Sequence, residues 1–200
     1  MEIILSIGSG NKELTRLSFI RGRFIKAEGR KFYLVRDDIV LENINTEAAD
    51  IGFLGSDFYD EVEYTPLGLS VNFEQILNDP IGRFVIAAPQ EEICQFKDKL
   101  YDKFCLNAIS VATKYPVSLA KVSRSLALNV AIQVSSAVEF MVDSGRADTM
   151  YDITVSGNTL KDWGYGVVMD CESIYLGMVY KAIDVWRDVP DTLGYNGGKS

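Results

Sequence analysis

The 200-residue chain contains no histidine. This absence excludes Ser-His and Cys-His nucleophilic machinery and removes the commonest zinc ligand. Any catalysis must therefore use carboxylates, Arg, Lys, Tyr, hydroxyl groups, backbone amides or a hard cation such as Mg²⁺. The chain has only three cysteines, Cys94, Cys105 and Cys171, and none of them forms a CxxC pair. This spacing favours reduced, structural thiols in a cytoplasmic protein.

Long apolar runs and an excess of positive charge are also missing. No apolar run approaches the roughly 20 residues that a transmembrane helix needs, and the first residues, MEIILSIGSGNKEL, do not resemble a signal peptide. We therefore expect a soluble protein that does not associate with membranes. The net charge of −8 argues against broad binding to nucleic acids, which requires a basic face.

Basic residues gather in one region, where they form either a solvated surface or the rim of a phosphate site. They are Arg16, Arg21, Arg23, Lys26, Arg30, Lys31 and Arg36.

The sequence does contain an alternation of strand-like and helix-like segments. Short apolar runs are followed by segments whose apolar residues recur at spacings of three and four. We predict strands over residues 2–7, 31–35, 50–55, 82–89, 108–113, 129–134, 147–154 and 166–171. We predict helices over residues 12–27, 38–49, 90–104, 116–127, 136–143 and 158–164. This alternation is typical of an α/β fold with mainly parallel sheets.

Single residues and short motifs mark the starts of some of these elements. The order of the elements indicates two lobes, and a cleft between lobes is a common ligand site. Pro116 is expected in the first turn of its helix, and Ser136 with Glu139 forms an S-x-x-E capping box. A loop containing Pro66 and Pro80 separates two of the strands. We expect lobe I to comprise residues 1–88 and 167–200, and lobe II to comprise residues 89–166.

The stretch 152-DITVSGNTL-160 has the composition of an anion-binding turn between a strand and a helix. Backbone amides at a helix start attract anions, and Gly157 lets the backbone approach a phosphate closely. Ser156, Asn158 and Thr159 add side-chain donors, while Asp152 is placed to hold a ribose hydroxyl or a magnesium-bound water. The alternative is an ordinary capped helix, which would need only one of these residues.

Several short blocks carry a resemblance to one enzyme family. They are 49-ADIGFLGSD-57, 82-GRFVIAAP-89, 110-SVATKYP-116, 136-SAVE-139, 145-GRADTMYD-152 and 156-SGNTL-160. In the order and spacing of these blocks, the chain resembles the short form of ATP phosphoribosyltransferase, the first enzyme of histidine biosynthesis. The resemblance implies a two-lobed fold similar to type II periplasmic binding proteins. It also implies that N1 of ATP attacks C1 of phosphoribosyl pyrophosphate (PRPP) and that pyrophosphate leaves.

The same resemblance implies roles for residues in the second half of the chain. The loop residues hold the 5′-phosphate of PRPP, and Asp152 faces the ribose. Lys114 and Tyr115, from the ATKYP block, lie near the substrate or simply begin a helix. Glu139 matches the Val-Glu pair of the family and binds substrate, or else serves only the capping box. Mg²⁺ arrives with the pyrophosphate, with no metal site in the protein.

In the N-terminal third, the resemblance implies one catalytic cation, and one turn departs from the family's pattern. Arg30, in 29-GRKF-32, stabilises the leaving pyrophosphate. In 6-SIGSGN-11, Ser9 and Asn11 stand where the family has Lys and Arg, and Lys12 follows one residue later. We expect these three residues to contact substrate.

By resemblance, a short form is a homodimer that assembles with a separate regulatory subunit. The altered turn leaves two alternatives open, which are transfer to another acceptor base and a nucleotide- or PRPP-binding protein without turnover.

Overall fold

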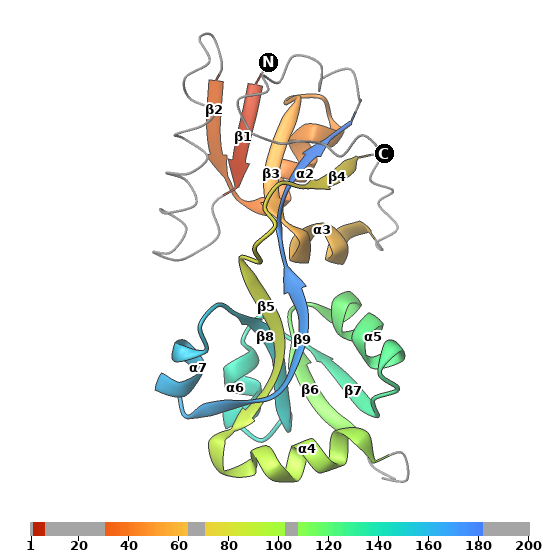
Figure 1. The fold of residues 1–200 in the computed structure, drawn as a ribbon, viewed down its shortest axis with the longest axis vertical. Helices are drawn as coiled ribbons and strands as arrows, with labels where there is room; N and C mark the ends of the chain where they lie inside the picture. The colour runs from red at the N-terminus through yellow and green to blue at the C-terminus, as the bar shows by residue number, and fades with distance from the viewer. Residues whose placement is uncertain (1, 7–30, 64–70, 103–107, 182–200) are drawn as a thin grey trace. The chain divides into compact units, whose positions relative to one another are not determined.

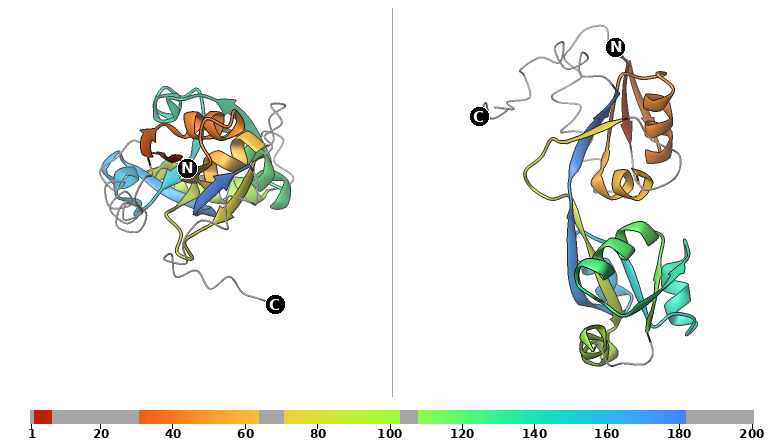
Figure 2. Two further views of the ribbon diagram at one scale, coloured as in Figure 1. Left: turned by 90° about the horizontal axis from the view of Figure 1, so that it is seen from above. Right: turned by 90° about the vertical axis from the view of Figure 1, so that its right-hand side faces the viewer.

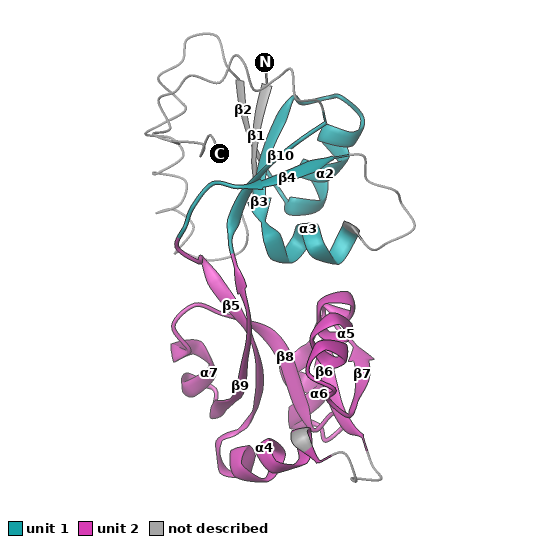
Figure 3. Ribbon diagram, turned by 45° about the vertical axis from the view of Figure 1, so that its right-hand side comes forward, with its two compact units in different colours: residues 1–78, 175–200 teal, residues 79–174 magenta. Residues whose placement is uncertain are grey.

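A computed structural model describes residues 2–6, 31–63, 71–102 and 108–181 of the chain. The chain divides into two compact units, coloured separately in Figure 3. Unit 1 comprises residues 1–78 and 175–200, and unit 2 comprises residues 79–174. Each unit is built on one five-stranded sheet.

Unit 1 contains a mixed sheet with strand order β2-β1-β3-β10-β4. β1 is parallel to β2 and β3, whereas β10 is antiparallel to both β3 and β4. Its elements are β1 (Glu2–Ser6), β2 (Lys31–Val35), α2 (Asp37–Asn45), β3 (Ile51–Gly55), α3 (Ser56–Glu63), β4 (Asn72–Gln75) and β10 (Leu176–Tyr180).

The core of unit 1 forms where α2 packs on the sheet. Val40, Leu41 and Ile44 of α2 are almost fully buried. Ile44 follows Val40 by four positions and Leu41 by three, and residues at these spacings share a helix face. Gly52 of β3 faces them, and a Cβ at this position would lie 2.3 Å from Cγ1 of Val40. Only glycine therefore lets α2 approach β3 this closely.

Unit 2 contains a second sheet, with strand order β7-β6-β8-β5-β9. β6 is parallel to β7 and β8, and β5 is antiparallel to β8 and β9. Its elements are β5 (Gly82–Pro89), a 3₁₀ turn (Gln90–Glu92), α4 (Ile93–Tyr101), β6 (Ile109–Thr113), α5 (Pro116–Ser125), β7 (Val130–Val134), α6 (Val138–Asp143), β8 (Thr149–Thr154), α7 (Asn158–Asp162) and β9 (Tyr165–Ile174).

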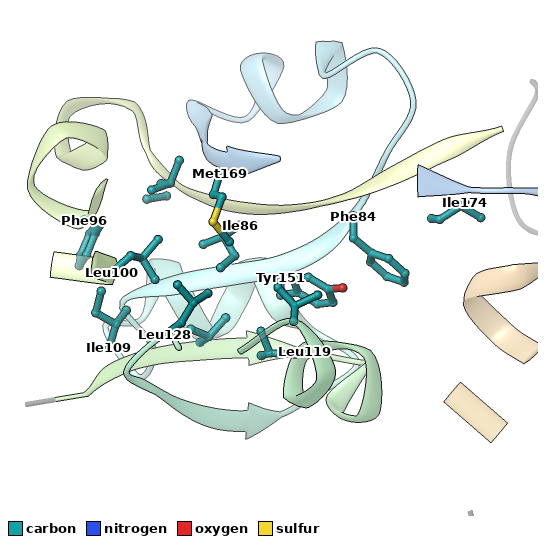
Figure 4. Packing of buried hydrophobic residues seen from close by; sticks show 14 residues of the cluster. Phe84, Ile86, Phe96, Leu100, Ile109, Leu119, Leu128, Tyr151, Met169 and Ile174 are labelled. Carbon is teal, nitrogen blue, oxygen red and sulfur yellow. The ribbon is translucent and has the colours of Figure 1, made fainter. Parts of the chain in front are cut away.

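Helices cover both faces of the unit 2 sheet. On one face, Phe96 of α4 and Leu119 of α5 pack with Phe84, Ile86 and Tyr151 from the strands (Figure 4). The rings of Phe84 and Tyr151 stack with centroids 4.8 Å apart. A sheet that is buried on both faces needs apolar residues on both sides, which is why 84-FVIAA-88 is continuously apolar.

The opposite face of this sheet carries a second core. Val138 and Val142 of α6 and Leu160 of α7 pack against Val85 and Ala87 of β5. β5 and β9 lie side by side along their length, as Figures 1 and 2 show. With both faces covered, the exposed parts of the sheet are its edges and the loops at the strand ends.

The expected α/β fold with mainly parallel sheets is confirmed, and each sheet has one reversed strand. Each predicted strand has a counterpart in the structure. The predicted helix over residues 12–27 lies outside the described residues. The boundaries of the two units differ from those of the predicted lobes, since unit 2 comprises residues 79–174 and lobe II was expected to comprise residues 89–166. Unit 2 includes Gly82–Pro89 because this strand pairs on both sides with strands of unit 2.

The differences from the sequence prediction include three elements that were not predicted and the start of α6. α3 and β4 lie where the sequence predicts a loop, and β10 follows the last predicted strand. The capping box at Ser136 and Glu139 is wrong. The N-cap is Ala137, whose amide donates to Oγ of Ser135 at 3.1 Å. Glu139 is therefore the second residue of α6, one position too early to close a capping box.

Within the described ranges, no helix combines the length and the hydropathy that crossing a membrane requires.

Candidate functional site

The candidate residues of unit 2 come from the loops at one edge of its sheet. β6, β7 and β8 are parallel, so their carboxyl ends lie at the same edge. β6 ends at Thr113, which pairs in register with Val134 of β7 and Tyr151 of β8. This register places Lys114, the next residue after β6, level with Asp152 of β8.

Lys114 and Asp152 form an ion pair at this edge. Nζ of Lys114 lies 3.3 Å from Oδ1 of Asp152, whose side chain is 17% exposed, against 46% for Lys114. The same Oδ1 accepts the backbone N–H of Ile153 at 2.8 Å. Both interactions use Oδ1 of the carboxylate.

Tyr115 is anchored more deeply than its neighbour. Its amide donates to Oγ1 of Thr113 at 2.8 Å, and its ring packs edge-on against Phe84, with centroids 5.0 Å apart. It is also the N-cap residue of α5, which begins at Pro116 as predicted. Nζ of Lys114 lies 5.3 Å from the centroid of the Tyr115 ring. Tyr115 therefore begins the helix and also supports the lysine beside the carboxylate.

The loop after β8 has an unusual backbone at Gly157. This residue adopts φ 74°, a left-handed conformation that favours glycine, and a Cβ there would meet nothing within 4 Å. Its amide donates to Oγ1 of Thr154 at 2.9 Å. Gly157 itself is buried, and its N–H group is already bonded to Thr154.

The exposed side chains of this loop supply polar groups that a ligand can reach. Ser156, Asn158 and Thr159 are all exposed, and Oγ of Ser156 accepts the amide of Asn158 at 3.4 Å. α7 has only five residues, so its dipole contributes less than the sequence prediction assumed. Any anion binding here rests mainly on the loop amides and side chains.

Glu139 lies near the start of α6, directly after the loop that follows β7, and is half-buried. Since the capping box does not form, the side chain of Glu139 does not cap the start of α6. The structure thus brings Lys114, Tyr115, Glu139, Asp152 and the 156–159 loop to one edge of the same sheet. Ser9, Asn11, Lys12 and Arg30 lie outside the described residues.

Two groups near this edge were not predicted. Thr113 and Thr154 are buried hydroxyl residues at strand ends, and each accepts a loop amide. Hydroxyls two or three residues before such a loop are a weak sequence signal for this turn. Arg83 pairs with Thr154 across β5 and β8 and forms an ion pair with Asp170 at 2.5 Å. Only sheet register reveals its position.

Metal-binding clusters are not evident in the parts of the chain that the structure describes, where no three acidic or thiol side chains gather closely enough to hold an ion.

The fold and the loops define a two-unit α/β protein with polar loops at the carboxyl edge of parallel strands. In both sheets the reversed strand occupies the fourth place in the spatial order. The periplasmic aliphatic sulphonate binding protein SsuA from Escherichia coli shares this fold, with a TM-score of 0.61 and 14% identity over 96% of this chain and 67% of that chain.

A family model described as HisG, ATP phosphoribosyltransferase, matches residues 36–179. The chain belongs to this family. An ATP phosphoribosyltransferase from Clostridium novyi is 32% identical over 151 residues, which are 74% of this chain and 65% of the relative. The solved ATP phosphoribosyl transferase (HisG:HisZ) complex from Thermotoga maritima matches with a TM-score of 0.66 and 20% identity, over 96% of this chain and 93% of that chain. The chain spans 50% to 65% of the length of the first curated relatives that it matches.

Proposed function

We propose that this chain transfers the phosphoribosyl group of PRPP to N1 of ATP, which yields phosphoribosyl-ATP and pyrophosphate. The observation that carries the proposal is the juxtaposition of the Ser156–Thr159 loop with the Lys114–Asp152 ion pair, in a chain of this family. The loop suits a phosphate group, and the ion pair suits the sugar to which that phosphate is attached.

The reaction requires positioning more than proton transfer. The lone pair on N1 of ATP attacks C1 of the ribose, the bond from C1 to the pyrophosphate oxygen breaks, and its electrons leave with pyrophosphate. Positive charge develops on the sugar, and negative charge develops on the leaving group. Alignment and electrostatic stabilisation lower such a barrier, so a chain without histidine can carry out the step.

Asp152 and Lys114 act on the ribose in this proposal. In this proposal Oδ2 of Asp152 accepts a hydrogen bond from a ribose hydroxyl, and the carboxylate charge favours the positive charge that develops at C1. Lys114 holds the carboxylate in place from the neighbouring strand end, at 3.3 Å. Tyr115 and Glu139 complete the substrate-binding edge, since both lie on loops that follow parallel strands.

The loop after β8 binds the 5′-phosphate of PRPP. Ser156, Asn158 and Thr159 are exposed and offer hydroxyl and amide donors. Gly157 contributes its left-handed conformation, and in this proposal a side chain at the position would stand in the way of the phosphate.

The remaining roles fall on the N-terminal region. Arg30 stabilises the leaving pyrophosphate, and Ser9, Asn11 and Lys12 contact substrate, as the family resemblance implies. When bound, Mg²⁺ neutralises charge on the pyrophosphate. We expect it to arrive with that group.

The oligomeric state also belongs to the proposal. We expect a homodimer that associates with a separate regulatory subunit. The Thermotoga maritima neighbour is a HisG:HisZ complex, which supports a partner of that kind. Light scattering of the purified chain, alone and mixed with a HisZ protein, tests both expectations.

The decisive assay measures pyrophosphate released from ATP and PRPP in the presence of Mg²⁺, with and without the regulatory subunit, and identifies the product by mass spectrometry. Phosphoribosyl-ATP is the expected product. A product from another base but none from ATP would instead show a different acceptor. Binding of PRPP without any pyrophosphate release in either assay would show a binding protein.

A further inference from the structure

Thr154, the last residue of β8, uses its side chain to close the loop that follows. It is 6% exposed, and its Oγ1 accepts the amide of Gly157 at 2.9 Å. This bond spans three residues and turns the chain back on itself within Val155 and Ser156. Gly157 is thereby held in the left-handed conformation from which α7 begins.

Thr149 at the other end of the same strand provides an internal comparison. It is fully buried, and its Oγ1 has no hydrogen-bond partner among the described residues. The two threonines thus share residue type, strand and burial, but only Thr154 uses its hydroxyl to bind a loop amide. Thr113 repeats the arrangement at the end of β6, where it accepts the amide of Tyr115 at 2.8 Å.

We propose that Thr154 is a positioning residue that preorganises the 155–159 loop for the phosphate group of the substrate. This inference rests on the proposed function of the loop. The amide of Gly157 is bonded to Thr154, so contact with the phosphate falls to the groups of Ser156, Asn158 and Thr159. Their placement depends on the backbone direction that the Thr154 bond sets.

The energetic reason is preorganisation. A loop that is already ordered before binding loses less conformational freedom when the ligand arrives. Removing the hydroxyl lets the loop sample other conformations, and the substrate must then select the competent one. Removing the hydroxyl is therefore expected to lower the affinity for PRPP and to leave the affinity for ATP unchanged.

The experiment compares Thr154→Val, Thr154→Ser and Thr149→Val with the wild-type chain. Hydrogen exchange of the Gly157 amide, followed by NMR without substrate, reports the bond itself. Calorimetry measures PRPP affinity, and steady-state assays of pyrophosphate release give KM for PRPP and for ATP. Thermal melts establish that each variant is folded before binding is compared.

We expect Thr154→Val to speed exchange at Gly157 and to weaken PRPP binding roughly fivefold, as loss of one hydrogen bond predicts. KM for PRPP rises accordingly, while KM for ATP stays within about twofold of wild type. Thr154→Ser restores slow exchange and PRPP affinity because it keeps the hydroxyl. Thr149→Val leaves both unchanged, because its hydroxyl makes no bond to the described residues.

Two outcomes overturn the inference while the wild-type chain still binds PRPP. One concerns Thr154→Val: unchanged binding would show that the bond does not prepare the loop for PRPP, and tighter binding would show that the hydroxyl competes with the phosphate for the Gly157 amide. The other is equal weakening by Thr149→Val, which would indicate a general effect on β8. Failure of the wild-type chain to bind PRPP would reject the proposed function itself. In that case, slow exchange of the Gly157 amide in the wild type and fast exchange in Thr154→Val would show that Thr154 nonetheless orders the loop.

Discussion

Nζ of Lys114 lies 3.3 Å from Oδ1 of Asp152, although the two residues belong to different strand ends. Because Lys114 is nearly half exposed, the pair contributes little to folding, about 0–1 kcal/mol. Its expected importance is for substrate. We predict that Asp152→Asn lowers kcat/KM for PRPP by roughly tenfold to a hundredfold, since a charged group near the reacting centre is lost. Steady-state assays of pyrophosphate release measure this loss, and an unchanged kcat/KM would place Asp152 away from the ribose.

Lys114→Met should weaken PRPP binding by roughly tenfold and change the free energy of unfolding by under about 1 kcal/mol. Lys181→Met is the control, because Lys181 is about as exposed as Lys114 and forms an ion pair at 2.9 Å in unit 1 with Glu47, which is more exposed than Asp152. Calorimetric PRPP titrations and urea unfolding of both variants provide the test. Equal losses of PRPP affinity in the two variants would contradict a specific role for Lys114.

Gly157→Ala separates backbone strain from ligand access. The left-handed conformation costs an L-residue about 1 kcal/mol, and the new Cβ enters the space assigned to the phosphate. Gly145→Ala is the control for backbone strain, because Gly145 has φ 68° and a Cβ there also meets nothing within 4 Å, although Gly145 is exposed and Gly157 is buried. We expect both variants to lose about 1 kcal/mol of stability in urea titrations, and only Gly157→Ala to lose measurable PRPP affinity. Normal PRPP binding by Gly157→Ala would remove the loop from the proposed site.

Tyr165 should make stability fall at alkaline pH. Its hydroxyl donates to the Asp143 carboxylate, and burial together with that carboxylate raises the pKa of Tyr165 well above its usual value of 10. Above about pH 10 the unfolded chain therefore releases this proton while the folded chain retains it, and the free energy of unfolding falls as pH rises. Tyr165→Phe should flatten this part of the pH profile in melts from about pH 8 to 11. Identical slopes for wild type and Tyr165→Phe would refute the assignment.

The cysteines should differ in reactivity. Burial raises the pKa of the Cys171 thiol to about 12, whereas Cys94 is exposed. Since the thiolate is the nucleophile, iodoacetamide at about pH 8 should label Cys94 at least about tenfold faster than Cys171 in the folded protein. Peptide mass spectrometry measures both rates, and labelling in urea should make them similar. Comparable rates in the folded state would show that Cys171 is accessible.

Local patterns predicted much of the fold. Pro116 at the start of α5 and the continuous apolar run of β5 are signals within a few residues, and both predictions are confirmed. α3 was missed although Phe58, Tyr59 and Val62 share a helical face, because its eight residues lie among acidic and loop-forming neighbours. β10 was missed because Gly177 weakens its strand signal, and only pairing with β3 and β4 makes it a strand.

The sequence by itself determined the chemistry that is possible, an α/β architecture, and the composition of the loop around Gly157. These follow from residue type and short-range periodicity, which every chain carries locally. Only the tertiary structure decided that Lys114 meets Asp152, that the Thr154 hydroxyl binds the Gly157 amide, and that Glu139 is not part of a capping box. Strand register and helix starts arise from packing between segments far apart in the chain, and no local pattern specifies those contacts.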